Sequence, residues 1–196
     1  MTPTTAMGHR TPDIGCMPLI DSAPLIVASR LGLDRQHGLH LRLHRQASWA
    51  AIRDRLLSGE LDAVHAMAAL VYGVQTGVGG PRADLAILMG LNQNGQAITL
   101  SPLLAAAIAA GRPLADAVQA MPRKPVFAQT FPTGTHAVWL YYWLAAHGVD
   151  PRHAIDVVTL PPPQMPDALL RGELDGFCAG EPWGAQAEAI GAGRRV

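Results

Sequence analysis

Two segments that share the pattern Leu-Leu-x-Gly-Glu-Leu-Asp constrain the fold of this chain more than any other feature. They span residues 56–67 and residues 169–180. In each, an apolar stretch ends at a glycine, Gly59 or Gly172, which suits the left-handed conformation that closes many helices. A short apolar run of strand length follows the aspartate. The echo therefore predicts two similar α/β lobes, although so short a pattern also recurs by chance.

The rest of the chain alternates between strand-like and helix-like segments, which favours largely parallel sheets. A change of composition near residues 97–102 indicates a hinge, so we expect a disordered lead-in over residues 1–12, lobe 1 over 13–97 and an incomplete lobe 2 over 98–196. The expected strands are 14–17, 39–43, 61–66, 85–91, 97–100, 125–128, 155–160 and 177–179. The expected helices are 23–31, 49–57, 68–76, 102–110, 114–120, 135–147, 164–170 and 182–190.

Composition narrows the class of protein. Of the 196 residues 49% are hydrophobic and 15% are charged, which is typical of a globular chain with a large core. Fifteen basic residues balance fifteen acidic ones, so no overall field favours nucleic acid or an anionic membrane. Cys16 and Cys178 fall in separate expected strands and form no disulfide framework. The first residues lack an apolar signal region and no run could span a bilayer, so we expect a cytoplasmic protein, or a periplasmic or membrane-associated one if the N-terminus is misannotated.

Several side chains are candidates for a ligand site. In open α/β sheets ligands bind beyond the carboxyl ends of strands, close to helix N-termini with their unpaired N–H groups. Trp49 beside the predicted cap Ser48, His65 at a strand end, Gln96 at the hinge and His136 in the first turn of a helix all occupy such places. Structural interpretations stay open for each: a core tryptophan, a satisfied core histidine, a turn amide and a solvated cap histidine.

Other patterns favour no chemistry. Trp139, Tyr142 and Trp143 follow helical spacing, and we interpret them as core packing. No serine lies in a nucleophile elbow, no His or Cys spacing fits a metal site, and no glycine-rich loop with a trailing helix and lysine fits a phosphate. We therefore expect a protein that is not an enzyme and needs neither cofactor nor metal.

Six short segments, taken together, resemble a known family. They are residues 18–25, 46–50, 59–63, 91–99, 134–136 and 180–183. In this order they resemble the nitrate- and bicarbonate-binding proteins of ABC transporters, NrtA and CmpA, and most of all the cytoplasmic nitrate/nitrite sensor NasS. The resemblance covers the chain from about residue 13 to its end.

The resemblance implies an α/β fold of the type II periplasmic-binding-protein class, with a ligand cleft between two lobes. It assigns the ligand contacts to Trp49, Gln96 and His136. A further lysine contact of the family lies beyond the Gly-Glu-Pro-Trp segment, and this chain ends at Val196 before that position. We therefore expect a truncated member that lacks the C-terminal segment returning to the first lobe.

The implied ligand is a small oxyanion. Nitrate has no proton to donate, so its pocket should consist of hydrogen-bond donors such as indole, amide and imidazole N–H groups. None of the three implied contacts is acidic, which favours nitrate or nitrite over bicarbonate. The resemblance implies an ABC permease or a NasT-like antiterminator as partner, and no direct contact with nucleic acid. Two alternatives stay open: a pyrimidine-precursor-synthase-like enzyme on the same fold, and an interaction module that binds no ligand.

Overall fold

The computed structural model describes residues 10–93 and 95–196. The chain divides into two compact units, Met1–Ala66 and Met67–Val196, which are described separately. This division lies earlier than the expected lobe boundary between residues 97 and 98. The difference arises because helix α3 (Ala68–Thr76) packs against helix α6 (Thr135–Ala146) of the second unit. Most of the expected lead-in lies outside the described residues, and Arg10 already forms a parallel bridge with Leu39.

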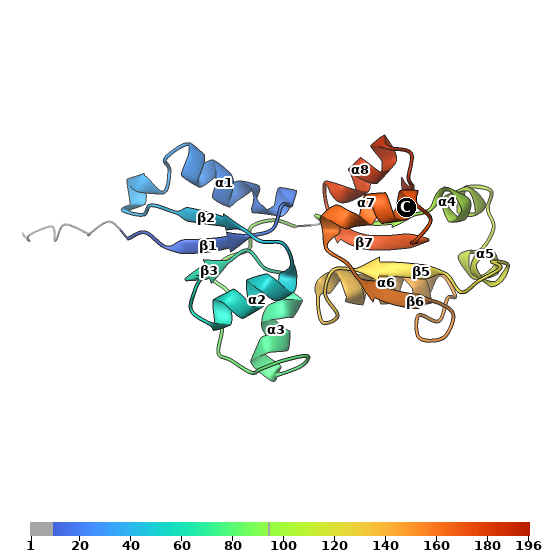
Figure 1. Ribbon diagram of the computed structural model, residues 1–196, viewed down its shortest axis with the longest axis horizontal. Helices are drawn as coiled ribbons and strands as arrows, with labels where there is room; N and C mark the ends of the chain where they lie inside the picture. The colour runs from blue at the N-terminus through green and yellow to red at the C-terminus, as the bar shows by residue number, and fades with distance from the viewer. Residues whose placement is uncertain (1–9, 94) are drawn as a thin grey trace, which may run out of the picture. The chain divides into compact units, whose positions relative to one another are not determined.

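The first unit is built on a parallel sheet. Within its described residues three strands, β1 (Asp13–Cys16), β2 (Arg42–Arg45) and β3 (Ala63–Val64), pair in the order β2-β1-β3. Helix α1 (Ala23–Arg30) connects β1 to β2, and helix α2 (Trp49–Leu57) connects β2 to β3. The two helices cover opposite faces of the sheet (Figure 1), because the first right-handed crossover runs from β1 to β2 and the second runs back from β2 past β1 to β3.

The second unit is built on a mixed sheet. Its described residues form five strands in the order β6-β5-β7-β4-β8, in which β5, β6 and β7 are parallel and β4 is antiparallel to both of its neighbours. The strands are β4 (Gln96–Leu100), β5 (Val126–Gln129), β6 (Asp156–Thr159), β7 (Gly176–Gly180) and β8 (Arg194–Arg195). The remaining helices are α4 (Pro102–Ala109), α5 (Leu114–Gln119), α7 (Met165–Leu170) and α8 (Trp183–Ala189). Its core includes Phe127, Leu140 and Phe177, all fully buried.

The strand order β6-β5-β7 repeats the order β2-β1-β3, with α6 and α7 in the positions of α1 and α2. The echoed sequence pattern is part of this repeat. Gly59 and Gly172 end their helices at φ values of 80° and 72°. The leucine directly before the aspartate, Leu61 or Leu174, is 2% exposed in each copy. The aspartate then accepts a hydrogen bond of 2.8 Å from the first amide of the neighbouring strand, Asp62 from Asp13 and Asp175 from Val126. The structure thus confirms the predicted repetition of an α/β unit.

Most of the local predictions are confirmed. Ser48 caps α2 by accepting a hydrogen bond of 3.1 Å from the amide of Ala51, as expected for a serine in this position. Both cysteines are buried, and burial raises the pKa of each thiol, that of Cys178 to about 12. The short strand β8 was not predicted from the sequence. No helix in the described part of the chain is long and apolar enough to cross a membrane.

The predicted buried strand at residues 85–91 is wrong. The segment has no regular structure, and Leu88 and Met89 are 82% and 68% exposed. The amide of Leu85 donates to the side-chain carbonyl of Gln75 at 3.1 Å instead of to a neighbouring strand. An apolar run without alternation does not reveal whether a pairing strand is available.

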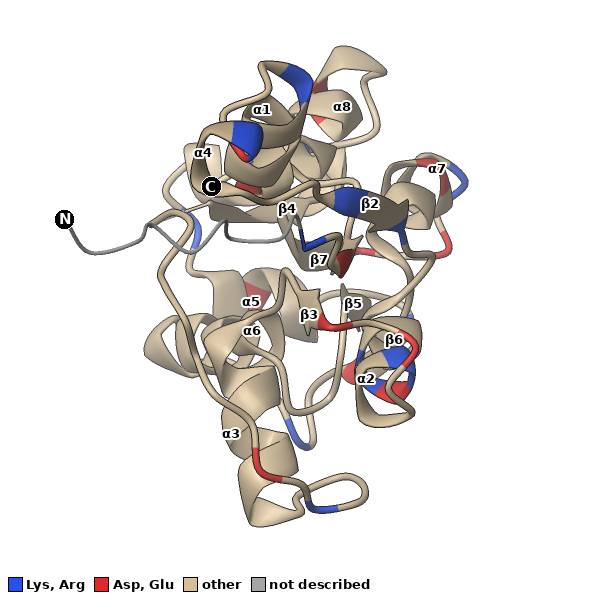
Figure 2. Ribbon diagram, turned by 90° about the vertical axis from the view of Figure 1, so that its left-hand side faces the viewer, with Lys and Arg blue, Asp and Glu red and all other residues tan. Residues whose placement is uncertain are grey.

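The interpretation of the α6 aromatics as core packing is also wrong for two of the three. Trp139 and Tyr142 are 49% and 69% exposed, and Trp143 alone of the three packs partly against the core. Helix α6 contains no Lys, Arg, Asp or Glu along its length (Figure 2). Its buried residues are His136 in the first turn and the small or aliphatic Ala137, Leu140 and Leu144. Because both faces are apolar, helical spacing could not identify the buried one.

Candidate functional site

The carboxyl edge of the first sheet brings two of the candidate residues together. Because β1, β2 and β3 are parallel, the residues that follow them gather at one edge. Trp49 is the first residue of α2 after β2, and His65 directly follows β3. Both side chains are buried, at 1% and 5% exposed, and their rings meet edge to face with centroids 5.5 Å apart. Trp49 and His65 therefore form one aromatic pair.

His65 is held in a neutral form. Burial lowers the pKa of its imidazole from 6.5 to about 4, since the charged form would lose its hydration. Its backbone amide donates to the carbonyl of Gly15 at 2.8 Å, while its buried Nδ1 has no hydrogen-bond partner among the described residues. The interpretation of a fully satisfied core histidine does not account for this atom. Most buried polar atoms have a hydrogen-bond partner, so this atom is an exception that the described protein groups do not explain.

Gln46 lies at the same edge, and its side chain stabilises the loop between β2 and α2. It is 4% exposed, its side-chain amide donates to the carbonyl of His44 at 3.1 Å, and its side-chain oxygen accepts from Arg55 at 3.0 Å. Both ends of this amide are thus occupied by protein groups. They hold the loop that positions Ser48 and Trp49 at the start of α2.

Gln96 and His136, the other two expected ligand contacts, both lie at the carboxyl edge of the second sheet. Strand β4 is antiparallel, so its first residue, Gln96, lies at the edge where β5 and β7 end, opposite Gly180 in register. His136 follows β5 through a short loop and lies in the first turn of α6, where it is 3% exposed. The strand order changes direction between β5 and β7, which is where open α/β sheets bind their ligands.

A threonine that the sequence did not single out contacts His136. Thr130 comes directly after β5, is 4% exposed, and places its hydroxyl oxygen 2.7 Å from Nδ1 of His136. The same hydroxyl lies 3.9 Å from the sulfur of Met67. The only signal in the sequence that could have identified Thr130 was a polar residue at the end of an expected buried strand. The contact itself joins a strand end to a helix start, so it depends on the folded loop.

A second polar pair at this edge was missed as well. The side-chain amide of Gln129, the last residue of β5, donates to the hydroxyl of Thr159 at the end of β6 at 2.7 Å. The side-chain oxygen of Gln129 is buried without a partner in the described part of the chain. The ends of β5 and β6 thus present neutral hydrogen-bonding groups.

The acidic residue at this edge is already engaged by protein groups. Glu181 directly follows β7, forms an ion pair of 2.9 Å with Arg195, and accepts a hydrogen bond from the amide of Ala185. Arg195 also pairs with Glu188 at 2.7 Å. The carboxylate is therefore already engaged, which reduces its repulsion of an anion.

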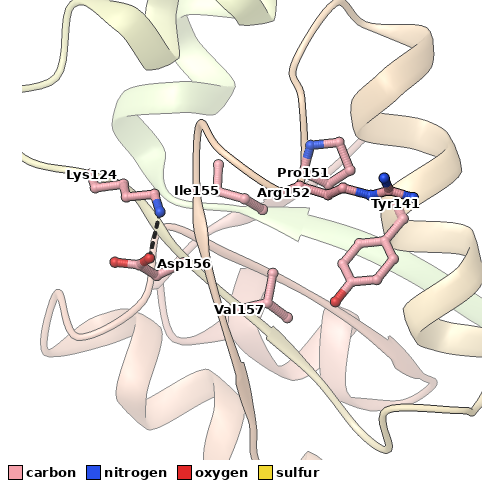
Figure 3. Close-up of a pocket in the computed structure, with 7 residues that line it drawn as sticks. All are labelled: Lys124, Tyr141, Pro151, Arg152, Ile155, Asp156 and Val157. Atoms are coloured by element: carbon pink, nitrogen blue, oxygen red, sulfur yellow. Dashed lines mark ion pairs between the residues drawn. The ribbon is translucent and has the colours of Figure 1, made fainter.

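A surface hollow elsewhere in the second unit does not coincide with these residues. It is lined by Lys124, Tyr141, Pro151, Arg152, Ile155, Asp156 and Val157 (Figure 3). Lys124 and Asp156 form an ion pair of 2.8 Å across it. Since Asp156 begins β6, the hollow lies at the amino end of the strand, whereas ligands of such sheets bind at the carboxyl ends. Among residues 10–93 and 95–196, no group of three or more His, Cys, Asp or Glu side chains could hold a metal ion.

Comparison with known proteins identifies the family. Residues 6–196 match the model of the NMT1-like family. The chain belongs to this family. It is 36% identical to the nitrate/nitrite binding protein NrtA of Synechococcus elongatus, over 94% of this chain and 46% of that protein. It is also 36% identical to the nitrate import ATP-binding protein NrtC of Synechocystis, over 89% of this chain and 27% of that protein.

Solved structures confirm the fold class of this NMT1-like protein. The crystal structure of the periplasmic nitrate-binding protein NrtA from Synechocystis matches with a TM-score of 0.86 and 34% identity, over 94% of this chain and 50% of that one. The alkanesulfonate-binding protein SsuA from Xanthomonas axonopodis shares the fold at 16% identity, with a TM-score of 0.64. The α/β fold is thus that of periplasmic solute-binding proteins. The chain spans about half the length of the NrtA relatives it matches.

Proposed function

We propose that this chain binds a small oxyanion, nitrate or nitrite, with Trp49, Gln96 and His136 as hydrogen-bond donors. The observation that carries the proposal is the similarity to proteins named for nitrate binding, at 36% identity and a TM-score of 0.86. Its support from the fold is the place of the three residues. Each lies at the carboxyl edge of its sheet, Trp49 in the first unit and Gln96 and His136 in the second.

The chemistry of these edges suits an anion that carries no proton. Indole N–H, amide N–H₂ and imidazole N–H groups donate to the oxygens of nitrate, and burial strengthens such bonds by excluding water. Bicarbonate carries an O–H group and profits from a free carboxylate acceptor. Glu181, the acid at the second edge, is occupied by Arg195 and the amide of Ala185. This favours nitrate and nitrite and leaves bicarbonate as the alternative ligand.

The role of binding follows from the relatives. One is named as periplasmic and another as part of nitrate import, which supports a solute-binding role with an ABC permease as partner. A cytoplasmic nitrate sensor acting on a NasT-like antiterminator is the second candidate role, suggested by the sequence resemblance. In either role the chain binds its ligand without transforming it. Nitrate-dependent capture of one purified partner and not of the other would decide between these roles.

Isothermal titration of the purified chain with nitrate, nitrite and bicarbonate tests the proposal. The variants Trp49→Phe, Gln96→Met and His136→Phe keep much of the side-chain volume and remove the donor. Each should weaken nitrate binding by about 1–3 kcal/mol, the usual cost of a lost bond to a charged group. Trp139→Phe, on the exposed side of α6, is the control and should leave the affinity unchanged. The proposal is excluded if nitrate and nitrite do not bind, or if all three variants bind as the parent does.

A further inference from the structure

We propose that Thr130 is a positioning residue that fixes His136 in the tautomer carrying its proton on Nε2, so that the imidazole offers a donor to the oxyanion. The assignment of the tautomer stands on the second unit alone. Its consequence for binding rests on the proposed function. Together they make Thr130 a determinant of which anions the protein accepts.

The geometry places a hydroxyl on one specific ring nitrogen. Thr130 directly follows β5, and the loop from there to α6 is closed by a hydrogen bond of 2.9 Å from the amide of Gly134 to the carbonyl of Phe131. This loop sets the start of α6 and directs His136 toward Thr130. The hydroxyl oxygen and Nδ1 lie 2.7 Å apart, and both residues are more than nine-tenths buried. Water therefore competes little for either atom.

The acceptors available to the hydroxyl proton indicate which atom donates. The 2.7 Å separation shows that the hydroxyl oxygen and Nδ1 share a hydrogen bond. If Nδ1 carried the ring proton, the hydroxyl would accept that bond and its own proton would need another acceptor. The other acceptor near the hydroxyl is the Met67 sulfur at 3.9 Å, a much weaker acceptor than an imidazole lone pair. The hydroxyl proton is thus directed to Nδ1.

A neutral imidazole has one N–H group and one lone pair. If Nδ1 accepts from Thr130, the ring proton resides on Nε2, and Nε2 can only donate. In the opposite tautomer the lone pair on Nε2 would face the oxygens of an anion and repel them. A hydrogen bond to one ring nitrogen commonly sets the tautomer of a histidine that binds a ligand through the other nitrogen. The arrangement favours nitrate and nitrite over anions that need an acceptor for their own proton.

Two matched substitutions separate the hydroxyl from the shape of the side chain. Thr130→Val keeps the branched shape and removes the hydroxyl, whereas Thr130→Ser keeps the hydroxyl. Long-range ¹⁵N–¹H NMR of the ligand-free full chain distinguishes the Nε2–H tautomer, the Nδ1–H tautomer and the imidazolium. The parent and Thr130→Ser should show the Nε2–H form of His136, and Thr130→Val should show a mixture of tautomers. Nitrate titration should then give a loss of affinity for Thr130→Val that equals the inverse of its remaining Nε2–H fraction, about twofold for an equal mixture.

A further variant removes the competing acceptor. Met67→Leu takes away the sulfur and should leave the His136 tautomer unchanged, because the hydroxyl proton already goes to Nδ1. An Nδ1–H or imidazolium form in the parent chain would overturn the proposal, and so would a Thr130→Val variant that keeps the Nε2–H form. A parent chain that shows the Nε2–H form yet binds neither nitrate nor nitrite would instead remove the proposed function. The NMR measurement therefore tests the tautomer proposal, and the binding measurement tests the proposed function independently.

Discussion

The same module, strand–helix–strand–helix–strand, occurs in both units, and its two copies differ in how their shared features are buried. In the second unit β4 and β8 extend the sheet beyond β7, and Asp175 is 5% exposed and pairs with Arg123 at 2.7 Å. In the first unit Asp62 is exposed, although it bonds to the equivalent strand amide at the same distance of 2.8 Å. A repeated local pattern thus yields the same geometry, while the surroundings determine its energetic importance.

The two carboxyl edges differ in a similar way. The first positions a buried histidine against an aromatic ring, with His65 and Trp49 5.5 Å apart. The second edge positions a buried histidine through a hydrogen bond, with the hydroxyl oxygen of Thr130 2.7 Å from Nδ1 of His136. An aromatic contact holds a ring in place without determining where its proton resides. A hydrogen bond to one ring nitrogen does both, which makes the second edge the more specific of the two.

The leucines directly before the motif aspartates, Leu61 and Leu174, should show the largest effect and the greatest similarity between copies. Leu61 and Leu174 are each 2% exposed, so Leu61→Ala and Leu174→Ala should each reduce the free energy of unfolding by about 3 kcal/mol. Hydrogen exchange read by mass spectrometry should place each loss in its own unit. Leu170→Ala, at a 56% exposed position, is the control and should cost far less. The equivalence of the copies would fail if only one leucine exceeded this control.

His65 should make the stability of the first unit depend on pH. The pKa of its imidazole is lowered to about 4 in the folded chain from 6.5, so the unfolded chain binds more protons between these values. The contribution of the neutral His65 ring to the free energy of unfolding is fully present above pH 6.5 and is lost as the pH falls toward 4. The loss amounts to up to about 3 kcal/mol, because each unit of pKa difference corresponds to about 1.4 kcal/mol. Urea unfolding across this range should show the loss in the parent chain.

The matched variants for this pH effect are His65→Gln, which removes the titrating group, and His37→Gln, which alters an exposed histidine. The first should flatten the pH dependence relative to the parent, and the second should preserve it. Equal pH profiles for the parent and His65→Gln would show that the buried ring contributes nothing to the difference.

The motif aspartates should separate the copies. Asp175→Ala leaves the Val126 amide without its acceptor and removes the partner of Arg123 in a buried place, at a cost of about 2–3 kcal/mol. Asp62→Ala exposes the Asp13 amide to water, so its cost should stay within about 1 kcal/mol. Urea unfolding of the two variants gives this comparison directly. Equal costs would mean that burial does not distinguish the copies.

The motif glycines should show the smallest and most equal effect. Gly59 and Gly172 have positive φ values, and a Cβ at either would meet nothing within 4 Å. The left-handed conformation alone should therefore make Gly59→Ala and Gly172→Ala cost about 1 kcal/mol each. Thermal unfolding is sensitive enough to measure this, with Gly90→Ala as a control in open space without a positive φ. A large difference between the two motif variants would reveal a constraint on one helix end that the shared geometry does not explain.

Much of the fold could be predicted because its signals are local. The glycine that ends a helix, the Ser48 cap and the short apolar strands each depend on a few neighbouring residues, and apart from the strand expected at 85–91 they lie close to their expected places. Boundaries were less certain, since the strand expected at 39–43 lies at Arg42–Arg45. The order of strands in a parallel sheet then follows from the alternation of helix and strand.

The sequence by itself determined a repeated α/β unit and a set of donors at strand ends and helix starts. Tertiary structure decided which apolar surfaces are buried, so the run 85–91 and two of the three α6 aromatics, Trp139 and Tyr142, were assigned incorrectly. It also decided the partners of the candidate residues, the ring of Trp49 for His65 and the hydroxyl of Thr130 for His136. The physical reason is that a cap or turn is set by residues close in the chain, whereas burial and side-chain pairing depend on segments that only folding brings into contact.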